Sequence, residues 1–284
     1  METIEITNIE QKQVLLIEIM SQVHDICEKY GLIYNLFGGT MLGAVRHKGI
    51  IPWDDDIDIT MPREDYKRFL DILKKEYSDV LVVHAFPDNN YIYPFAKIGM
   101  KGTYLSERIV RNKYNNLTLN IDVFPNDGYP DDEDIFNEYS ECEKAIIRHT
   151  YKASSKTKYK IKAALIRIKW DFLNLIDRHD IYYYLQEQIA MISKKSIDES
   201  EYIICQGAGW GKKGKLKKDI YYNRELYDFN GKRFWGISDY DEHLTALYGD
   251  YMALPPKDKR QSPHTYDLRV EKEVYIKYLG GREK

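Results

Sequence analysis

The chain has 284 residues and a nearly balanced charge, with 42 basic and 45 acidic side chains, a formal net charge of −3 and a mean hydropathy of −0.56. This balance argues against a general affinity for nucleic acids, and no apolar run of about 18 residues predicts a transmembrane helix. The first residues, METIEITNIE, do not resemble a signal peptide, and three cysteines without a Cys-x-x-Cys pair favour reduced thiols. We therefore expect a cytoplasmic protein with one large domain or two small ones.

The first part of the chain predicts a helix, a strand and a glycine turn. Apolar residues recur at helical spacing from Leu15 to Tyr30, and Gly31 suits the end of that helix. The apolar run Leu32–Phe37 predicts a strand, and the helix-like Met41–Val45 comes soon after it. Between them, Gly38-Gly39-Thr40 is typical of a phosphate site at a helix N-terminus, where Thr40 caps the helix or bonds a phosphate oxygen. An ordinary turn is the alternative for a motif this short.

An acidic run follows, with aspartates at positions 54, 55, 56 and 58. The alternation Asp56-Ile57-Asp58-Ile59 predicts a strand with one acidic face. Two carboxylates about 5 Å apart repel by about 3 kcal/mol at an effective dielectric constant near 20, so a half-buried acidic strand needs a compensating cation. Oxygen ligands favour Mg²⁺ or Mn²⁺. A solvated acidic loop is the alternative, but it does not require the interleaved isoleucines.

The middle of the chain predicts a helix from Pro62 and then further strands. The strands are expected at residues 80–86, 91–100, 103–105 and 120–124. The last one carries a lone Asp122 between Ile121 and Val123 and ends at Pro125. A surface-facing residue on an edge strand would explain Asp122. Because of the acidic run upstream, we favour a third metal ligand or general base at this position.

Residues 134–194 predict three helices, with breaks near Ser154-Ser155 and Asp180. The stretch from Ala145 to Trp170 has no acidic residue but many lysines, including Lys158, Lys162 and Lys169. Its apolar side chains share one helical face: Ile161, Leu165, Ile168, Phe172 and Ile176. Such a basic amphipathic helix suits an anionic membrane or an anionic polymer. The alternative is a solvated basic face over an ordinary core stripe.

The C-terminal part predicts a strand at Tyr202–Cys205 and then a loop rich in glycine and lysine at residues 207–215, which contains Trp210. This loop matches no phosphate-binding fingerprint, so a surface loop and a loop over a pyrophosphate are both open. Asn230-Gly231 predicts a type I′ hairpin. A final helix is expected to end at Tyr248, before Gly249, and the chain after Leu254 is expected to be extended on the surface.

The run GGTMLGAVRHKGIIPWDDDIDI, from Gly38 to Ile59, resembles the LicD family, whose bacterial members look like phosphocholine transferases acting on cell-surface glycans. Three later segments fit the same family: Tyr93–Lys97, Ile121–Pro125 and Tyr248–Tyr251 followed by Pro255-Pro256. The resemblance implies an α+β nucleotidyltransferase-like fold, with a mixed sheet flanked by helices. We expect a catalytic core at residues 1–130, a helical segment at 131–198 and a C-terminal portion at 199–284 that completes the cleft, together forming one compact domain.

The resemblance also implies a site and a reaction. The catalytic carboxylates would be Asp56, Asp58 and Asp122, and these would bind Mg²⁺ or Mn²⁺, with Asp54 a further ligand and Asp55 pointing away. The substrate-binding residues would be Gly38, Gly39, Thr40, Arg46, His47 and Lys97. Trp210 joins them for a separate reason, because an exposed aromatic ring suits a trimethylammonium head group. A structural salt bridge is the alternative for the charged members of this set. His47 as a base would need a pKa lowered by its cationic neighbours.

The expected reaction is transfer of phosphocholine, or a similar phospho-alcohol, from a CDP-linked donor to a glycan or its lipid-linked precursor. The products would be modified teichoic acid or lipopolysaccharide, made at the inner face of the membrane by a peripherally associated enzyme that binds no nucleic acid. Ribitol phosphate and glycerol phosphate are alternative transferred groups. A glycosyltransferase that binds a nucleotide sugar through its Asp-x-Asp pair is another enzyme reading. A non-catalytic glycan- or nucleotide-binding protein is the third alternative.

Overall fold

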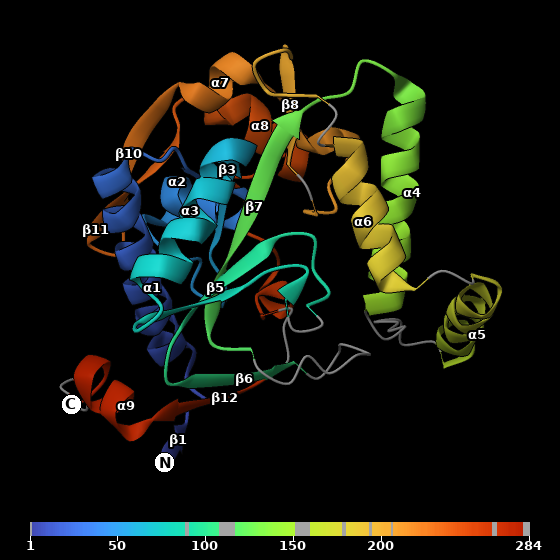
Figure 1. Ribbon diagram of the computed structural model, residues 1–284. Coiled ribbons are helices and arrows are strands. Elements are labelled where there is room, and N and C mark those ends of the chain that lie inside the picture. The colour runs from blue at the N-terminus through green and yellow to red at the C-terminus, as the bar shows by residue number, and fades with distance from the viewer. Residues whose placement is uncertain are drawn as a thin grey trace.

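The computed structural model describes residues 2–88, 91–107, 117–150, 160–177, 180–192, 195–205, 207–262 and 266–280. Helices flank a curled mixed sheet (Figure 1), which confirms the predicted α+β class. The strands of this sheet are β2 (Asn35–Leu36), β3 (Asp58–Pro62), β4 (Leu81–His84), β5 (Ala96–Met100), β7 (Asn120–Gly128), β8 (Tyr202–Cys205) and β9 (Lys215–Lys217). The order is β2-β3-β7-β5-β4, with β8 paired to β7 and β9 paired to β8.

Strand β7 lies at the centre of the sheet, parallel to β3 and antiparallel to β5. The prediction that this strand ends at Pro125 is wrong, since Asn126 to Gly128 continue it and pair with β8. Pro125 lies where the neighbour on one side changes from β5 to β8, so its missing N–H removes no bond from either pairing. The central position also excludes the edge-strand explanation of Asp122.

The N-terminal helices pack against this sheet. Helix α1 (Ile9–Tyr30) begins where Asn8 Oδ1 accepts a hydrogen bond from the Glu10 N–H at 2.7 Å, and it ends at Gly31 with φ +61°, as predicted. Helix α3 (Arg63–Glu76) begins one residue later than predicted, because Pro62 is still the last residue of β3. Both helices contact β7 and lie together to its left in Figure 1.

The three helices predicted in the middle of the chain are present. They are α4 (Glu133–Thr150), α5 (Lys160–Ile176) and α6 (Ile181–Ile192). The predicted break at Ser154-Ser155 and the residue Lys158 lie outside the described residues. Helices α4 and α6 pack side by side, whereas α5 lies beyond them at the right edge of Figure 1.

The predicted type I′ hairpin is formed by β10 (Arg224–Phe229) and β11 (Lys232–Ile237), with positive φ angles at Asn230 and Gly231. The remaining short elements are η2 (Gly211–Gly214), α7 (Lys218–Tyr222), α8 (Tyr240–Tyr248) and η3 (Lys257–Lys259). Helix α8 ends before Gly249, as predicted.

The prediction of an extended surface tail is wrong. Strand β12 (Tyr266–Glu271) lies between β1 (Thr3–Glu5) and β6 (Thr103–Glu107) in a second sheet, and α9 (Lys272–Tyr278) follows it. Leu268 and Val270 of β12 are buried, because apolar residues alternate along the strand. That alternation was visible in the sequence, but the charged residues between the apolar ones obscured it.

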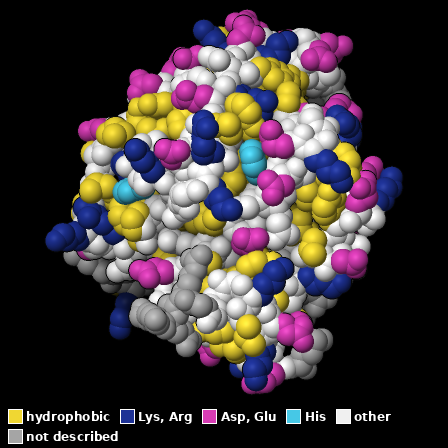
Figure 2. Space-filling view, turned by 90° about the vertical axis from the view of Figure 1, so that its left-hand side faces the viewer, with side chains coloured by type: hydrophobic (Ala, Val, Ile, Leu, Met, Phe, Trp, Pro, Cys, Tyr) yellow, Lys and Arg dark blue, Asp and Glu magenta, His cyan; other side chains and the backbone are white. Residues whose placement is uncertain are grey.

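The face in Figure 2 carries interspersed Lys, Arg, Asp and Glu side chains with scattered apolar ones. Among the helices that the structure describes, none has the length and apolar character needed to span a lipid bilayer.

Candidate active site

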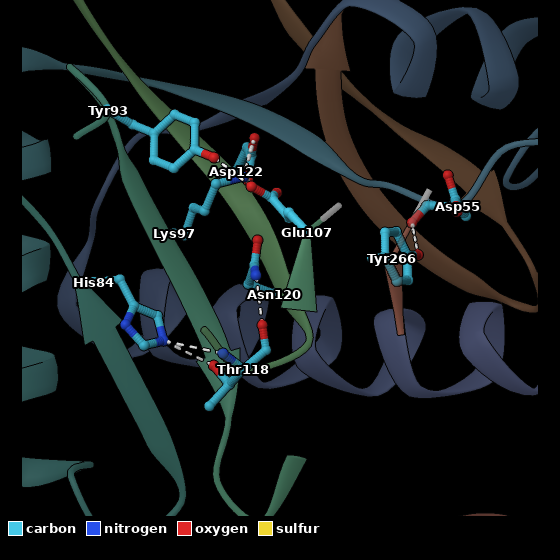
Figure 3. A network of polar contacts seen from close by, with 9 residues as sticks. All are labelled: Asp55, His84, Tyr93, Lys97, Glu107, Thr118, Asn120, Asp122 and Tyr266. Carbon is cyan, nitrogen blue, oxygen red and sulfur yellow. Dashed lines mark hydrogen bonds and ion pairs between the residues drawn. The ribbon is translucent and has the colours of Figure 1, made fainter. Parts of the chain in front are cut away.

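Three neighbouring strands place charged side chains in a row across the centre of the main sheet. Asp58 of β3 stands opposite Asp122 of β7, and Asp122 stands opposite Lys97 of β5. Residues in register on adjacent strands project from the same face of a sheet. Lys97 Nζ donates hydrogen bonds to both carboxylate oxygens of Asp122, at 2.7 and 2.9 Å (Figure 3). We call Asp58, Asp122 and Lys97 the charged row.

The acidic run carries more negative charge than Lys97 can balance. Burial, and then the charge of Asp56, raises the pKa of the Asp54 carboxyl to about 8. Burial raises the pKa of Asp58 well above its usual range, and the charges of Asp56, Asp122 and Asp54 raise it further, while Lys97 opposes the shift. Asp54 and Asp56 therefore join Asp58 and Asp122 of the charged row in one electrostatic cluster of four carboxyl groups, and such a cluster favours a bound cation.

The predicted strand from Asp56 to Ile59 begins only at Asp58. The alternation still holds, because Ile57 and Ile59 are fully buried while Asp56 and Asp58 are partly exposed. The Asp122 N–H donates to the Ile57 carbonyl at 2.9 Å and fixes this segment against β7. Asp56 therefore belongs to the cluster although it lies just before the first residue of β3.

Asp55 makes contacts of its own, apart from the charged row (Figure 3). Its buried carboxylate accepts a hydrogen bond from Ser262 Oγ at 2.6 Å, and its carbonyl accepts one from the Tyr266 hydroxyl at 3.3 Å. Sequence reasoning missed both partners because the C-terminal tail was expected to be extended on the surface. The structure gives Asp55 a role in joining that tail to the acidic run.

The glycine turn lies directly against the carboxylates. Helix α2 (Gly38–His47) starts there, and a Cβ atom at Gly39 would lie 3.4 Å from Asp54 Oδ2. Gly38 has φ +53°, and a Cβ there would lie 3.8 Å from Asp58 Oδ2 and 3.5 Å from the Tyr248 hydroxyl. Glycine therefore lets the backbone of the turn approach these carboxylates closely, at the N-terminus of the helix.

The prediction that Thr40 caps α2 is wrong, since Phe37 is the N-cap residue and has no side-chain capping bond. Thr40 lies within the first turn, and its buried hydroxyl accepts a hydrogen bond from the Asp58 N–H at 2.8 Å. The helix begins three residues earlier than expected, at Gly38 rather than Met41, because glycine does not prevent helical geometry in the first turn. Thr40 therefore holds β3 to the turn.

Arg46 and His47 lie at the other end of α2. Arg46 Nη1 donates to the carbonyls of Tyr251 and Ala253, at 2.6 and 3.2 Å, and Arg46 Nε donates to His47 Nε2 at 2.9 Å. Burial and then the charge of Arg46 lower the pKa of His47, which is the direction that its cationic neighbours predict. Arg46 therefore contacts the loop after α8, while His47 contacts Arg46 and packs edge to face on the ring of Trp53, with centroids 5.9 Å apart. These contacts are not with the charged row.

Trp210 reaches the site through Tyr248. The two rings pack edge to face with centroids 5.5 Å apart, and burial followed by the charge of Asp58 raises the pKa of the Tyr248 hydroxyl. The loop around Trp210 is held by α4, because the Gly209 N–H donates to Glu143 Oε1 at 3.0 Å. Tyr248 was not among the predicted site residues, although it begins the segment Tyr248–Tyr251 that carries the family resemblance.

Next to the charged row, opposite Lys97 on β4, a buried histidine provides a test of the electrostatics. His84 Nε2 lies 2.9 Å from Thr118 Oγ1, and burial, with the nearby charge of Lys97, lowers the pKa of His84 to about 4 (Figure 3). The unfolded chain, with a pKa near 6.5, binds the proton first as the pH falls. The free energy of unfolding should therefore fall by about 3 kcal/mol between pH 7 and pH 4 through this group.

Urea unfolding of the wild type and of His84→Gln, in EDTA at pH 7 and pH 4, measures how much His84 contributes to the pH dependence of the free energy of unfolding. We expect the variant to lose less stability than the wild type over that interval. Equal losses would show that His84 is already free to take up a proton in the folded protein.

The oxygen donors of the cluster suit a metal ion, but the side chains are not already arranged around a metal position. Carboxylate oxygens are the ligands that Mg²⁺ and Mn²⁺ prefer. Burial, and then the neighbouring carboxylates, raise the pKa values of Asp54 and Asp58. Over the described residues, no three acidic, histidine or cysteine side chains are already arranged as a cage for an ion. Both oxygens of Asp122 accept from Lys97. Ligation by Asp54, Asp56, Asp58 and Asp122 therefore stays a prediction.

Comparison with known proteins identifies the class. Residues 31–149 match the family model described as LicD/FKTN/FKRP, nucleotidyltransferase domain. The lipopolysaccharide cholinephosphotransferase LicD of Haemophilus influenzae is 32% identical over 267 residues, which cover 92% of this chain and 97% of that protein. The human ribitol 5-phosphate transferase FKRP is 46% identical over 48 residues, which cover 17% of this chain and 10% of that protein.

Both named relatives move a phosphate-containing group, and this chain is an enzyme of the same class, a transferase. The charged row and the glycine turn are parts that such chemistry uses. The match extends over nearly the whole chain, so the resemblance seen between Gly38 and Ile59 reflects common descent. The chain belongs to the LicD family.

Proposed function

We propose that this enzyme transfers phosphocholine from a CDP-linked donor to a hydroxyl group of a cell-surface glycan or its lipid-linked precursor, at the cytoplasmic face of the membrane. The observation that carries the proposal is the match to a lipopolysaccharide cholinephosphotransferase over 97% of that protein's length. The carboxylates against the glycine turn support it, since phosphoryl transfer needs gripped phosphates and neutralised charge.

In the proposed reaction, the acceptor hydroxyl oxygen attacks the phosphorus that carries choline. The bond from that phosphorus to the bridging oxygen breaks, and CMP leaves with the bridging oxygen. The hydroxyl proton passes to a carboxylate of the cluster, for which Asp122 is our candidate. Lys97 donates charge-assisted hydrogen bonds to both oxygens of Asp122 and so orients this carboxylate.

We further propose that Asp56 and Asp58, with Asp54, hold Mg²⁺ or Mn²⁺. A bound divalent ion supplies charge neutralisation for the donor phosphates. Gly38 and Gly39 then let the backbone of α2 approach those phosphates.

The head group is proposed to pack near Trp210 and Tyr248, whose rings meet beside the glycine turn. A trimethylammonium group donates no hydrogen bond, so aromatic faces are its natural partners, at about 0.5–2 kcal/mol per contact. Ribitol phosphate is the second candidate, favoured by the match to FKRP. A ribitol chain would instead require polar partners for several hydroxyls.

The donor is tested by thermal stabilisation of the purified enzyme with Mg²⁺ and, separately, CDP-choline, CDP-ethanolamine, CDP-ribitol, CDP-glycerol or UDP-glucose. At a donor concentration 100 times its Kd, the gain is about 2.7 kcal/mol, enough to raise Tm by several degrees. We expect the largest shift with CDP-choline and a smaller one with CDP-ethanolamine. A larger Tm shift with CDP-ribitol than with CDP-choline would replace phosphocholine by ribitol phosphate as the transferred group. A larger Tm shift with UDP-glucose would restore the glycosyltransferase alternative.

A further inference from the structure

Helix α5 exposes an apolar stripe that the rest of the described molecule does not cover. The stripe consists of Ile161, Leu165, Ile168, Phe172, Leu175 and Ile176. Each of these side chains is more than half exposed, and Ile161 and Leu175 reach 79% and 78%. At 100° per residue, all six fall within an arc of about 100°, which is the width of a helical face that is normally buried.

The opposite side of α5 contacts the protein. Ala163, Ile166, Trp170 and Leu173 are partly buried, and α4 is the neighbour. The apolar stripe therefore points away from α4, outward from the edge of the molecule at which Figure 1 shows the helix. Burying this face in a partner would remove several large side chains from water, which is the main source of free energy for association.

Basic residues outnumber acidic ones around the stripe. On the helical wheel, Lys162 and Lys169 border one side, whereas Asp171, the one acidic residue of α5, is the charged residue nearest the other side, with Lys160 and Arg167 just beyond it. Long basic side chains at the boundary of an apolar face can place their charges in the headgroup layer while their stems cover apolar surface. This differs from the face in Figure 2, where both charges are interspersed.

We propose that α5 docks on an anionic lipid surface, with the apolar stripe among the acyl chains and the flanking basic residues at the headgroups. Charge favours this partner over a second copy of the chain, because pairing two α5 helices face to face would bring eight basic groups together against two acidic ones. The docking would bring the enzyme to a lipid-linked acceptor. That consequence rests on the proposed function, but the membrane contact does not.

Binding to vesicles tests the proposal without substrate. The full chain is mixed with vesicles of phosphatidylglycerol and phosphatidylcholine, or of phosphatidylcholine alone, and separated by flotation at 50 mM and 500 mM salt. We expect strong binding to the anionic vesicles at low salt and much weaker binding at high salt, where screening acts within a few ångströms.

Matched variants separate the contribution of the basic residues to membrane binding from that of the apolar stripe. Lys162→Gln with Lys169→Gln should weaken binding about 25-fold, at about fivefold per charge near an anionic surface. Leu165→Ser with Phe172→Ser should weaken it more than tenfold. The controls are Lys257→Gln with Lys259→Gln on η3, and Ile276→Ser on α9, which change equally exposed residues elsewhere and should leave binding unchanged.

Three outcomes would overturn the proposal: no binding of the wild type to anionic vesicles at low salt, undiminished binding of the Leu165/Phe172 variant, or a dimer in solution that this variant abolishes. Thermal unfolding of each variant checks that its fold is retained. Because no donor is present, failure here leaves the proposed transfer reaction standing, and failure of the donor experiment leaves the membrane contact standing.

Discussion

Asp58→Asn should lower the rate of transfer by roughly 10³-fold while the protein stays as stable as the wild type or becomes more stable. The substitution keeps the shape of the side chain and leaves the Thr40 hydrogen bond to the Asp58 backbone intact. It removes a carboxylate whose pKa is raised by burial and by three neighbouring carboxylates, so repulsion in the empty site decreases. A residue that served only structure would show the opposite pattern, with stability lost and activity retained.

The measurement pairs thermal unfolding in EDTA with initial rates at saturating Mg²⁺. Asp55→Asn is the informative contrast in the same acidic run, because its carboxylate accepts from Ser262 and lies apart from the charged row. That variant should lose stability more than rate. Wild-type turnover that persists in excess EDTA, or an Asp58→Asn enzyme with normal rates, would remove Asp58 and its metal from the mechanism.

Lys97→Met should destabilise the protein by about 3–5 kcal/mol and abolish transfer, because it leaves the partly buried Asp122 without its cation and beside Asp58. The side chain of Lys97 is only 9% exposed, so water cannot replace the lost charge. Adding Asp122→Asn removes the unpaired carboxylate, and the double variant should recover much of the stability but none of the activity.

A double-mutant cycle measured by urea unfolding quantifies this pair. Lys101→Met, which changes an exposed lysine just beyond the same strand, is the matched control and should cost less than about 0.5 kcal/mol. If the double variant were as unstable as Lys97→Met alone, Lys97 would act through a contact other than Asp122.

Local patterns predicted the fold where the decisive interactions were local. Gly31 ended a helix with regular apolar spacing, and Asn230-Gly231 set the positive φ angles of a hairpin. The course of β7 past Pro125 and the pairing of β12 could not be read this way. Both depend on neighbours far away in the sequence, namely β8 for one and β1 and β6 for the other.

In the candidate site, too, local features could be predicted from the sequence and contacts between distant segments could not. Crowded aspartates predicted an electrostatic cluster, and the raised pKa values of Asp54 and Asp58 agree with that physical argument. The bond between Lys97 and Asp122 joins β5 to β7, and register between strands is set by the whole sheet rather than by either segment. The contacts of Arg46 with the loop after α8, and of Trp210 with Tyr248, likewise join segments about 40 to 200 residues apart.

The position of β12 between β1 and β6 has a consequence for how the protein is made. A ribosome releases β1 and β6 long before β12, so neither strand has its partner while most of the chain is being synthesised. Until then, both present unpaired backbone groups that invite pairing with other nascent chains. Closing this sheet across nearly the full length of the chain also carries a large loop-closure entropy and slows folding. Recombinant yield should therefore depend on the completion of β12, and slower production at low temperature should favour the correctly paired form.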